Sequence, residues 1–361
     1  MHSKLIAKKA DSKSPARSRS WERTKRACIR LIGIAPVLPL AGAAYQFIAT
    51  KRDERKYPPP GRLVDVGGHR LHILCSGEDG LENRPTVVLD AGWGDFSLAW
   101  SLVQPEVSKF AKVCAFDRAG LGWSDAAPGP RSSKQIAREL STLLRNAGIN
   151  GPYVLVGHSF GAINVRLFAS LYPSEVAGMV LVDPAHEDQA VRYRKRARHS
   201  LIMKIGLLLA PLGIPRLFLP IYATYHPAFS KKCKYSGFLV SAYRAILART
   251  RHLHTCYDEL VNIWESLDEA RAAAGPLGDM PLRVITAPLK GHPADNAIWM
   301  EIHEELSRRS TRGRQIIAEN SGHYPHYDEP ELVIQAVRQV IEAANESAQD
   351  LSFTSKISGR E

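Results

Sequence analysis

A short stretch at residues 151–173, GPYVLVGHSFGAINVRLFASLYP, constrains the fold of this chain most strongly. The apolar run Tyr153–Val156 has the length of a buried strand, and it leads directly into GHSFG at residues 157–161 and then into apolar residues at helical spacing. Either the chain needs a tight turn here, or it needs Ser159 held up as a nucleophile. Placed between a strand and a helix, the G-x-S-x-G pattern favours an exposed, reactive Ser159.

Strand-like runs recur along the chain and alternate with helical patterns. The expected strands are Leu63–Val66, Arg70–Cys75, Thr86–Leu89, Lys112–Phe116, Tyr153–Val156, Met179–Val182, Leu282–Thr286 and Gln315–Ala318. Gly67-Gly68 between the first two is a hairpin signal, so the sheet is expected to open antiparallel and to continue parallel through βαβ units. The chain's 361 residues can form one large α/β domain with an insertion, or two small domains. We predict an α/β fold with a mostly parallel eight-stranded sheet flanked by helices.

The alternation stops between Pro184 and Met280. Helical patterns broken by prolines, such as LIMKIGLLLAPLGIPRLFLP at residues 201–220, predict a helical lid insertion at about residues 185–280. Its apolar residues are typical of lid core packing. The alternative is a hydrophobic acyl channel that opens toward a membrane, beside a basic run at residues 192–198 that suits an anionic lipid surface.

The N-terminal region differs from the rest in charge. Residues 1–30 contain ten Lys and Arg and two acids, so they carry +8 of the net charge of +12, and little basic character remains to support nucleic-acid binding by the folded part. Nineteen uncharged residues, 31–49, can just cross a bilayer. The excess of Lys and Arg before them predicts a single-pass anchor with a cytoplasmic N-terminus and an extracytoplasmic main domain.

Two other interpretations of residues 31–49 stay open. Ala41-Gly42-Ala43 resembles the cleavage site of a signal peptide, which would leave a secreted protein. The segment could also be a helix lying on the domain. After it, residues 50–61 are interpreted as a charged, proline-stiffened linker, residues 62–345 as the main domain, and the polar residues 346–361 as a disordered tail.

The five cysteines show no metal-binding spacing. Cys75 and Cys114 lie in strand-like runs, which predicts buried thiols. Cys233 and Cys256 could form a disulfide if the domain lies outside the cytoplasm.

A serine nucleophile needs a base, and the segment IIAENSGHYPHYDEPELV at residues 316–333 offers one. His323 follows the last expected strand in a Ser-Gly-His turn, where it can hang over the strand tips together with Ser159. His326, three residues on, is interpreted as a surface or helix-capping histidine, and His158 as a packing residue.

Five motifs follow one another along the chain: VVLDAGWGDFSLAW, AFDRAGLGWSD, VLVGHSFG, VLVDPAHED and SGHYPHYDEPELV. Together they resemble the α/β-hydrolase superfamily, in particular its serine esterases and lipases. The resemblance spans about residues 60–345 apart from the insertion. The N-terminal segment followed by PPPGRLVDVGGHRLHILCSG also resembles a bacterial membrane-anchored branch of this superfamily.

The resemblance implies a triad in the order serine, acid, histidine. Asp183, at the end of an expected strand, is preferred as the acid because a carboxylate at a strand tip is well placed to orient a histidine. Asp295, on the loop after the seventh strand, is the alternative. The oxyanion donors are expected to be the backbone N–H groups of Phe160 and Trp93. The DRAGLGWS turn that contains Asp117 and Ser124 is interpreted as structural.

These residues predict a serine hydrolase that cleaves carboxylic ester or related acyl bonds of a hydrophobic small molecule through an acyl-enzyme on Ser159. No metal, organic cofactor or obligate protein partner is implied. A serine nucleophile argues against the aspartate-based mechanism of dehalogenases and epoxide hydrolases. A peptidase, thioesterase or C–C hydrolase on the same fold stays open, as does a non-catalytic ligand-binding or scaffold protein.

Overall fold

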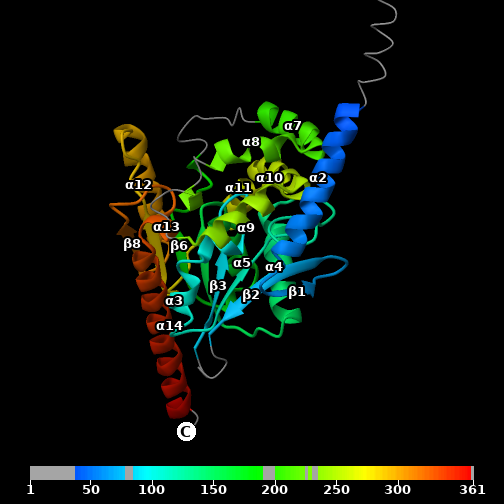
Figure 1. The fold of residues 1–361 in the computed structure, drawn as a ribbon. Coiled ribbons are helices and arrows are strands. Elements are labelled where there is room, and N and C mark those ends of the chain that lie inside the picture. Colours follow the sequence, from blue (N-terminus) through cyan, green and yellow to red (C-terminus); the bar gives the residue numbers. More distant parts are fainter. Residues whose placement is uncertain (1–36, 78–83, 190–199, 224–226, 230–234, 359–361) are drawn as a thin grey trace, which may run out of the picture.

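A single eight-stranded sheet organises the chain. The computed structural model describes residues 37–77, 84–189, 200–223, 227–229 and 235–358 (Figure 1). The strands, in the order β1-β2-β4-β3-β5-β6-β7-β8, are β1 Arg62–Asp65, β2 Arg70–Ser76, β4 Val113–Phe116, β3 Thr86–Asp90, β5 Tyr153–His158, β6 Val176–Val182, β7 Leu282–Thr286 and β8 Gly313–Ile317. The pairs β1–β2 and β2–β4 are antiparallel and all later pairs are parallel. The predicted fold is confirmed.

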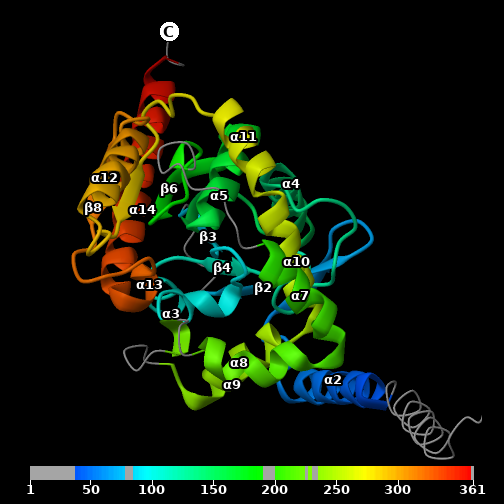
Figure 2. The same ribbon diagram turned by 90° about the horizontal axis from the view of Figure 1, so that it is seen from above.

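Helices cover both faces of the sheet, because the buried strands are apolar on both sides. Val87 and Leu89 of β3 pack into one core cluster while Val88 packs into the other. On the first face lie α3 (Gln104–Val107) and α14 (Pro330–Ser358); on the second lie α4 (Ser133–Asn146), α5 (Phe160–Leu171) and α11 (Ile263–Ala272) (Figure 2). Both faces of the described sheet are therefore covered by helices, whereas the ends of its strands are not covered by these helices.

The segment between β6 and β7 contains further helices, here called the β6–β7 segment. They are α7 Ser200–Leu209, η3 Ala210–Leu212, α8 Ile214–Ala223, η4 Pro227–Phe229, α9 Gly237–Leu247, α10 Thr250–Val261 and α11. In Figure 1 helices α7–α10 lie above the sheet. The predicted basic run at residues 192–198 lies outside the described residues.

Helix α2, Val37–Lys56, packs along the β6–β7 segment (Figures 1 and 2). The buried Gln46 donates to the Ala248 carbonyl at 2.9 Å, and Arg216 of α8 forms an ion pair with Asp53. Because the helix continues to Lys56, residues 50–56 are helical and do not form the predicted linker. Among the described residues no single helix is long and apolar enough to span a bilayer. The bent helix pair Met203–Leu212 and Ile214–Pro220 together has the length and the apolar composition of a span. Residues 1–36 lie outside the described ranges.

Two further expectations differ from the structure. Helix α14 runs to Ser358, so the described part of the predicted disordered tail is helical. Cys75 and Cys114 are not thiols: they form a disulfide, because the antiparallel register of β2 and β4 places them directly opposite each other. Cys256 is buried and unpaired among the described residues, and its suggested partner Cys233 lies outside them.

Candidate active site

Ser159 occupies a strained turn between β5 and α5. Its φ is 50°, a backbone conformation that side-chain-bearing residues rarely adopt. A Cβ on Gly157 would meet Ala162 backbone at 2.7 Å, and one on Gly161 would meet the Asp90 carbonyl oxygen at 2.5 Å. Only glycine fits at both positions, and the turn holds the serine at the carboxyl end of the sheet.

His323 lies between Ser159 and Asp183. Its Nε2 is 2.9 Å from the Ser159 Oγ, and its Nδ1 is 2.6 Å from Asp183 Oδ2. The carboxylate can only accept, so Nδ1 carries the proton and Nε2 accepts from the serine hydroxyl. The structure therefore brings together the three residues that sequence reasoning preferred, in the geometry that activates a serine.

Asp183 is fully buried and held from several sides. The Ala287 N–H donates to its Oδ1 at 2.9 Å, and the Trp299 indole donates to the same oxygen at 3.0 Å, which leaves Oδ2 to His323. Trp299 was not singled out from the sequence. Asp295 lies in the first turn of α12 (Pro293–Ser307) and is not a partner of either His323 ring nitrogen, since both are already engaged.

Backbone strain is concentrated at this site. Within the described residues, the non-glycine residues with positive φ are Ser159 and Asp183, the latter with φ 40°. Such conformations cost about 1–3 kcal/mol each and persist where the surroundings over-determine them. The two strained positions carry the two side chains that His323 joins, so strain independently indicates this site.

A hydrogen bond from His158 supports the loop that carries His323. The His158 ring donates from Nε2 to the His323 carbonyl at 2.7 Å, so this packing residue also supports the loop. His326 is fully buried in α13 (Pro325–Asp328), where its ring packs at a tilt against Trp100 and His158. The expectation of a surface histidine at position 326 is wrong, because the short helix α13 turns its ring into the aromatic core.

The two expected oxyanion donors flank the serine. Phe160 begins α5, and the first N–H groups of a helix have no intrahelical partner. Trp93 follows Gly92, where an added Cβ would lie only 3.5 Å from the Ser159 Cβ. The backbone of the loop after β3, residues 91–94, therefore passes beside Ser159; it is called the oxyanion loop below for the role expected of Trp93.

The DRAGLGWS turn behaves as the sequence predicted. Asp117 accepts N–H groups of Ser97 and Trp123, both at 2.8 Å, and the Ser124 hydroxyl donates to the Asp117 carbonyl at 2.6 Å. Burial alone would raise the pKa of Asp117, but His72 and the backbone donors outweigh it and hold the pKa below its ordinary value. These contacts keep the turn closed.

An apolar cavity of about 570 Å³ adjoins the site. Trp93 from the oxyanion loop and Tyr324 from the histidine loop line one part, and the β6–β7 segment supplies most of the remainder: Met203, Ile205, Gly206, Leu207, Leu209, Ile214, Pro215, Phe218, Leu219, Leu247, His252, Leu253 and Cys256. Its volume is in the range of small-molecule sites. Two of its lining residues, Trp93 and Tyr324, are the chain neighbours of Gly92 and His323, which places the cavity next to the loops around Ser159.

Acid is expected to destabilise the protein through His303. This fully buried residue of α12 donates to the Pro184 carbonyl, and burial lowers its pKa from 6.5 to about 4 although the nearby Asp183 opposes the shift. The unfolded chain takes up this proton below pH 6.5 and the folded one does not, so stability is lost as pH falls from about 6.5 toward 4. The loss from pH 7.5 to 5.0 should be about 2 kcal/mol for this group, measured by urea unfolding. A His303→Gln protein should show a correspondingly flatter pH dependence, and an unchanged slope would contradict the assignment.

Comparison with known proteins supports a single family. The model of the alpha/beta hydrolase family matches residues 87–336. A Bacillus subtilis protein, YqjL, is 27% identical over 267 residues, 74% of this chain and 87% of its own length. An uncharacterized vacuolar membrane protein of Saccharomyces cerevisiae is 31% identical over 134 residues, but these cover 33% of this chain and 21% of the yeast protein.

Solved structures show the same fold. Cfl2 from Burkholderia cenocepacia superposes with a TM-score of 0.61 at 24% identity, covering 78% of this chain and 95% of Cfl2. A putative epoxide hydrolase from Pseudomonas aeruginosa also gives 0.61, at 19% identity, covering 80% of this chain and 98% of that one. At these identities the likeness is one of fold, so the chemistry has to be argued from the site.

Proposed function

Because the chain belongs to the alpha/beta hydrolase family, we propose that it is a serine hydrolase that cleaves carboxylic ester bonds through an acyl-enzyme on Ser159. The observation that carries the proposal is the hydrogen-bonded series from the Ser159 Oγ through the His323 ring to the buried Asp183 carboxylate. In this arrangement the Ser159 hydroxyl is paired with a base at the distance that proton transfer needs.

In the proposed mechanism His323 Nε2 takes the Ser159 proton while the Oγ attacks the ester carbonyl. Asp183 keeps the proton of the ring on Nδ1 and stabilises the imidazolium that forms. The N–H groups of Phe160 and Trp93 bind the oxyanion, each worth about 3–4 kcal/mol. His323 then returns the proton to the leaving alcohol, and water repeats the cycle to release the acid.

The serine at position 159 favours ester over epoxide cleavage, although some structural neighbours are named epoxide hydrolases. Attack of a carboxylate on an epoxide gives an ester, which water can hydrolyse. Attack of a serine hydroxyl on the same carbon would give an ether, which water would not cleave under these conditions. With Ser159 as the group beside His323, a carbonyl substrate lets the cycle close and an epoxide does not.

The apolar cavity favours a hydrophobic acyl or alcohol group. In this proposal the β6–β7 segment acts as the lid, since it lines most of the space beside Trp93 and Tyr324. Large apolar side chains are exposed on the same helices, including Leu201, Ile205 and Leu208 of α7 and Leu217 and Phe218 of α8. An apolar outer face next to an apolar cavity suits a substrate delivered from a lipid surface.

The proposed location is the outer face of a membrane, to which the N-terminal segment ahead of the docked part of α2 attaches the protein. The Cys75–Cys114 disulfide supports an extracytoplasmic domain, since such bonds persist in oxidising compartments. Val37, Leu38, Leu40, Phe47 and Ile48 of α2 are exposed, as lipid-facing residues would be. Gly42, inside the alternative cleavage site, packs against Leu212, so the helix is part of the folded protein and cleavage there is not favoured.

A panel of p-nitrophenyl esters of graded acyl length tests the substrate class. Gly206 lines the cavity and an added Cβ would meet no atom within 4 Å, so a side chain has room to begin there and Gly206→Phe is expected to narrow the space. We expect kcat/KM for decanoate to fall by about 10-fold relative to acetate, the loss of apolar contact worth about 1.4 kcal/mol. Gly206→Ala is the matched control and should keep the parent preference. An equal loss for all acyl lengths in Gly206→Phe would exclude this cavity as the acyl site.

A further inference from the structure

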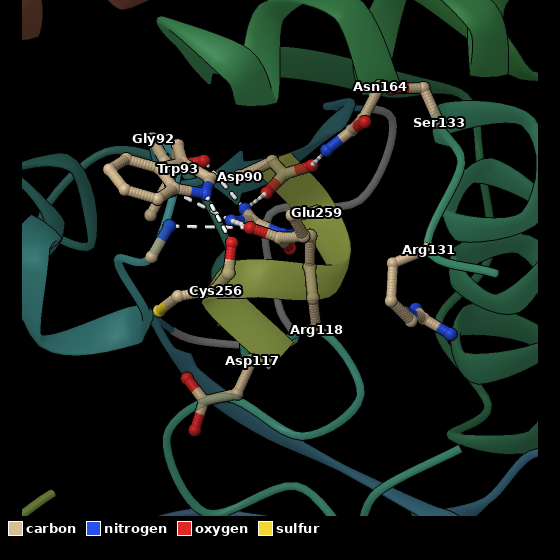
Figure 3. A network of polar contacts seen from close by, with 12 residues as sticks. Asp90, Gly92, Trp93, Asp117, Arg118, Arg131, Ser133, Asn164, Cys256 and Glu259 are labelled. Carbon is tan, nitrogen blue, oxygen red and sulfur yellow. Dashed lines mark hydrogen bonds and ion pairs between the residues drawn. The ribbon is translucent and has the colours of Figure 1, made fainter. Parts of the chain in front are cut away.

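Arg118 is a buried cation that contacts the oxyanion loop directly. It lies in the turn after β4 and is 1% exposed. Its Nη1 donates to the Ala91 carbonyl at 2.7 Å, and its Nη2 donates to the Gly92 carbonyl at 2.8 Å. Figure 3 shows the guanidinium beneath this loop. One side chain therefore fixes two successive carbonyl groups immediately before Trp93.

Two carboxylates hold Arg118 in place. Asp90, the last residue of β3, accepts from Nη1 at 2.6 Å, and Glu259 of α10 accepts from Nε at 2.6 Å and from Nη2 at 3.2 Å (Figure 3). Glu259 also accepts the N–H of Gly94 at 3.3 Å. A helix of the β6–β7 segment thus contacts the oxyanion loop both directly and through Arg118.

The peptide between Gly92 and Trp93 has a direction that follows from these contacts. In a planar trans peptide the N–H points opposite to the C=O. The Gly92 carbonyl points to the Arg118 guanidinium below, so the N–H of Trp93 points away from it. The indole of Trp93 donates to the Cys256 carbonyl at 2.8 Å, which places a second tie between this residue and α10.

We propose that Arg118, held by Glu259, is a positioning residue that aims the Trp93 N–H at the oxyanion formed on Ser159. The inference rests on the proposed function and adds a physical link between α10 and the oxyanion loop. Because the two are joined through Arg118 and Glu259, the position of the β6–β7 segment determines the direction of the Trp93 N–H and so how well it binds the oxyanion. Arg118 itself touches neither substrate nor the reacting atoms.

Two neighbouring carboxylates keep the buried Arg118 charged. Burial alone would lower the pKa of Arg118, but Glu259 and Asp90 outweigh it and hold the pKa above its ordinary value. Removing one carboxylate leaves Arg118 and one remaining carboxylate, a balanced buried pair, whereas removing the arginine leaves two buried carboxylates together. Glu259→Gln is therefore the gentler test. It disrupts the contacts specifically, because an amide NH₂ only donates: in either orientation of the amide, it faces an N–H of Arg118 that a carboxylate oxygen accepted before.

The experiment compares the full-length parent, Glu259→Gln and Arg118→Lys in detergent. A lysine keeps the charge but cannot reach four acceptors as the planar guanidinium does. We expect kcat for a short-chain ester to fall about 10-fold in Glu259→Gln and about 100-fold in Arg118→Lys, with KM changed less than 3-fold, since an oxyanion donor acts in the transition state. Active sites are counted by complete fluorophosphonate labelling, so misfolded molecules do not enter the rates.

A second readout separates positioning from general destabilisation. The affinity for an alkyl boronic acid, which forms a tetrahedral adduct on a reactive serine, should weaken by the same factor as kcat. The affinity for an unreactive amide analogue of the ester should stay unchanged. Arg131 and Glu139 form another buried bidentate pair, at 2.9 and 2.6 Å, so Glu139→Gln and Arg131→Lys are matched controls that should leave kcat within 3-fold.

The outcomes distinguish the two proposals. If the parent is labelled and hydrolyses esters, but the Glu259 and Arg118 variants match the Arg131 and Glu139 controls per active site, the positioning role is overturned while the serine hydrolase stands. A boronic acid affinity that stays constant while kcat falls would also overturn it. An unlabelled, inactive parent would refute the proposed function, and the inference would fall with it.

Discussion

Replacing Ser159 with alanine is expected to abolish covalent labelling by a fluorophosphonate and to lower ester turnover by roughly 10⁶-fold. The reason is chemical: the Ser159 Oγ is the atom within 2.9 Å of His323 Nε2, and alanine leaves no nucleophile to form the acyl-enzyme. Intact mass before and after labelling, on the full-length protein in detergent, should show one adduct in the parent and none in the variant.

Two comparisons make this result specific. Ser101 carries an ordinary hydroxyl that donates to the Leu98 carbonyl, away from His323, so Ser101→Ala should keep full labelling and turnover. An adduct that persists in Ser159→Ala would place the reactive group elsewhere. No adduct in the folded parent, with or without added lipid, would favour a non-catalytic ligand-binding or scaffold protein on a hydrolase fold.

Asp183→Asn is expected to lower kcat by about 10⁴-fold, whereas Asp295→Asn should change it less than 3-fold. An asparagine at position 183 could accept from Trp299 and Ala287 through its oxygen but would present its NH₂ to His323 Nδ1, and so favour the tautomer with the proton on the wrong nitrogen. Asp295 lies in the first turn of α12 and engages neither ring nitrogen.

The pH profile adds a readout beyond the rate itself. Residual activity of Asp183→Asn should depend on pH differently from the parent, because the imidazolium loses its buried counter-charge. Thermal melting of both variants at pH 8 checks that folding is intact. A large loss in Asp295→Asn with a small loss in Asp183→Asn would reverse the assignment of the acid.

Much of the fold was predictable because local patterns and long-range packing agree. The alternation of apolar strands with helices predicted all eight strands, and the Gly67-Gly68 turn predicted the antiparallel start. The glycines around Ser159 and the position of His323 after the last strand were enough to anticipate which side chains meet, since strand tips share one edge of a parallel sheet.

The errors concern features that depend on partners distant in sequence. The Cys75–Cys114 disulfide follows from the register of β2 against β4, which single-strand patterns do not contain. Trp299 and Glu259 reach Asp183 and Arg118 from helices whose placement the sequence did not determine. Residues 50–56 resemble a linker in composition, but helix α2 carries them because Arg216 pairs with Asp53.

The docking of α2 determines where the chain can be cut. Gln46 and Asp53 are the partners of Ala248 and Arg216, so loss of α2 by a cut near Pro58 would leave a buried carbonyl and a guanidinium without them and would uncover the Leu212 backbone beside Gly42. Proteolysis at the end of this helix would release the protein from a membrane. It would also loosen the β6–β7 segment, which lines most of the cavity. A fragment for purification should therefore keep α2, whose exposed apolar residues call for detergent.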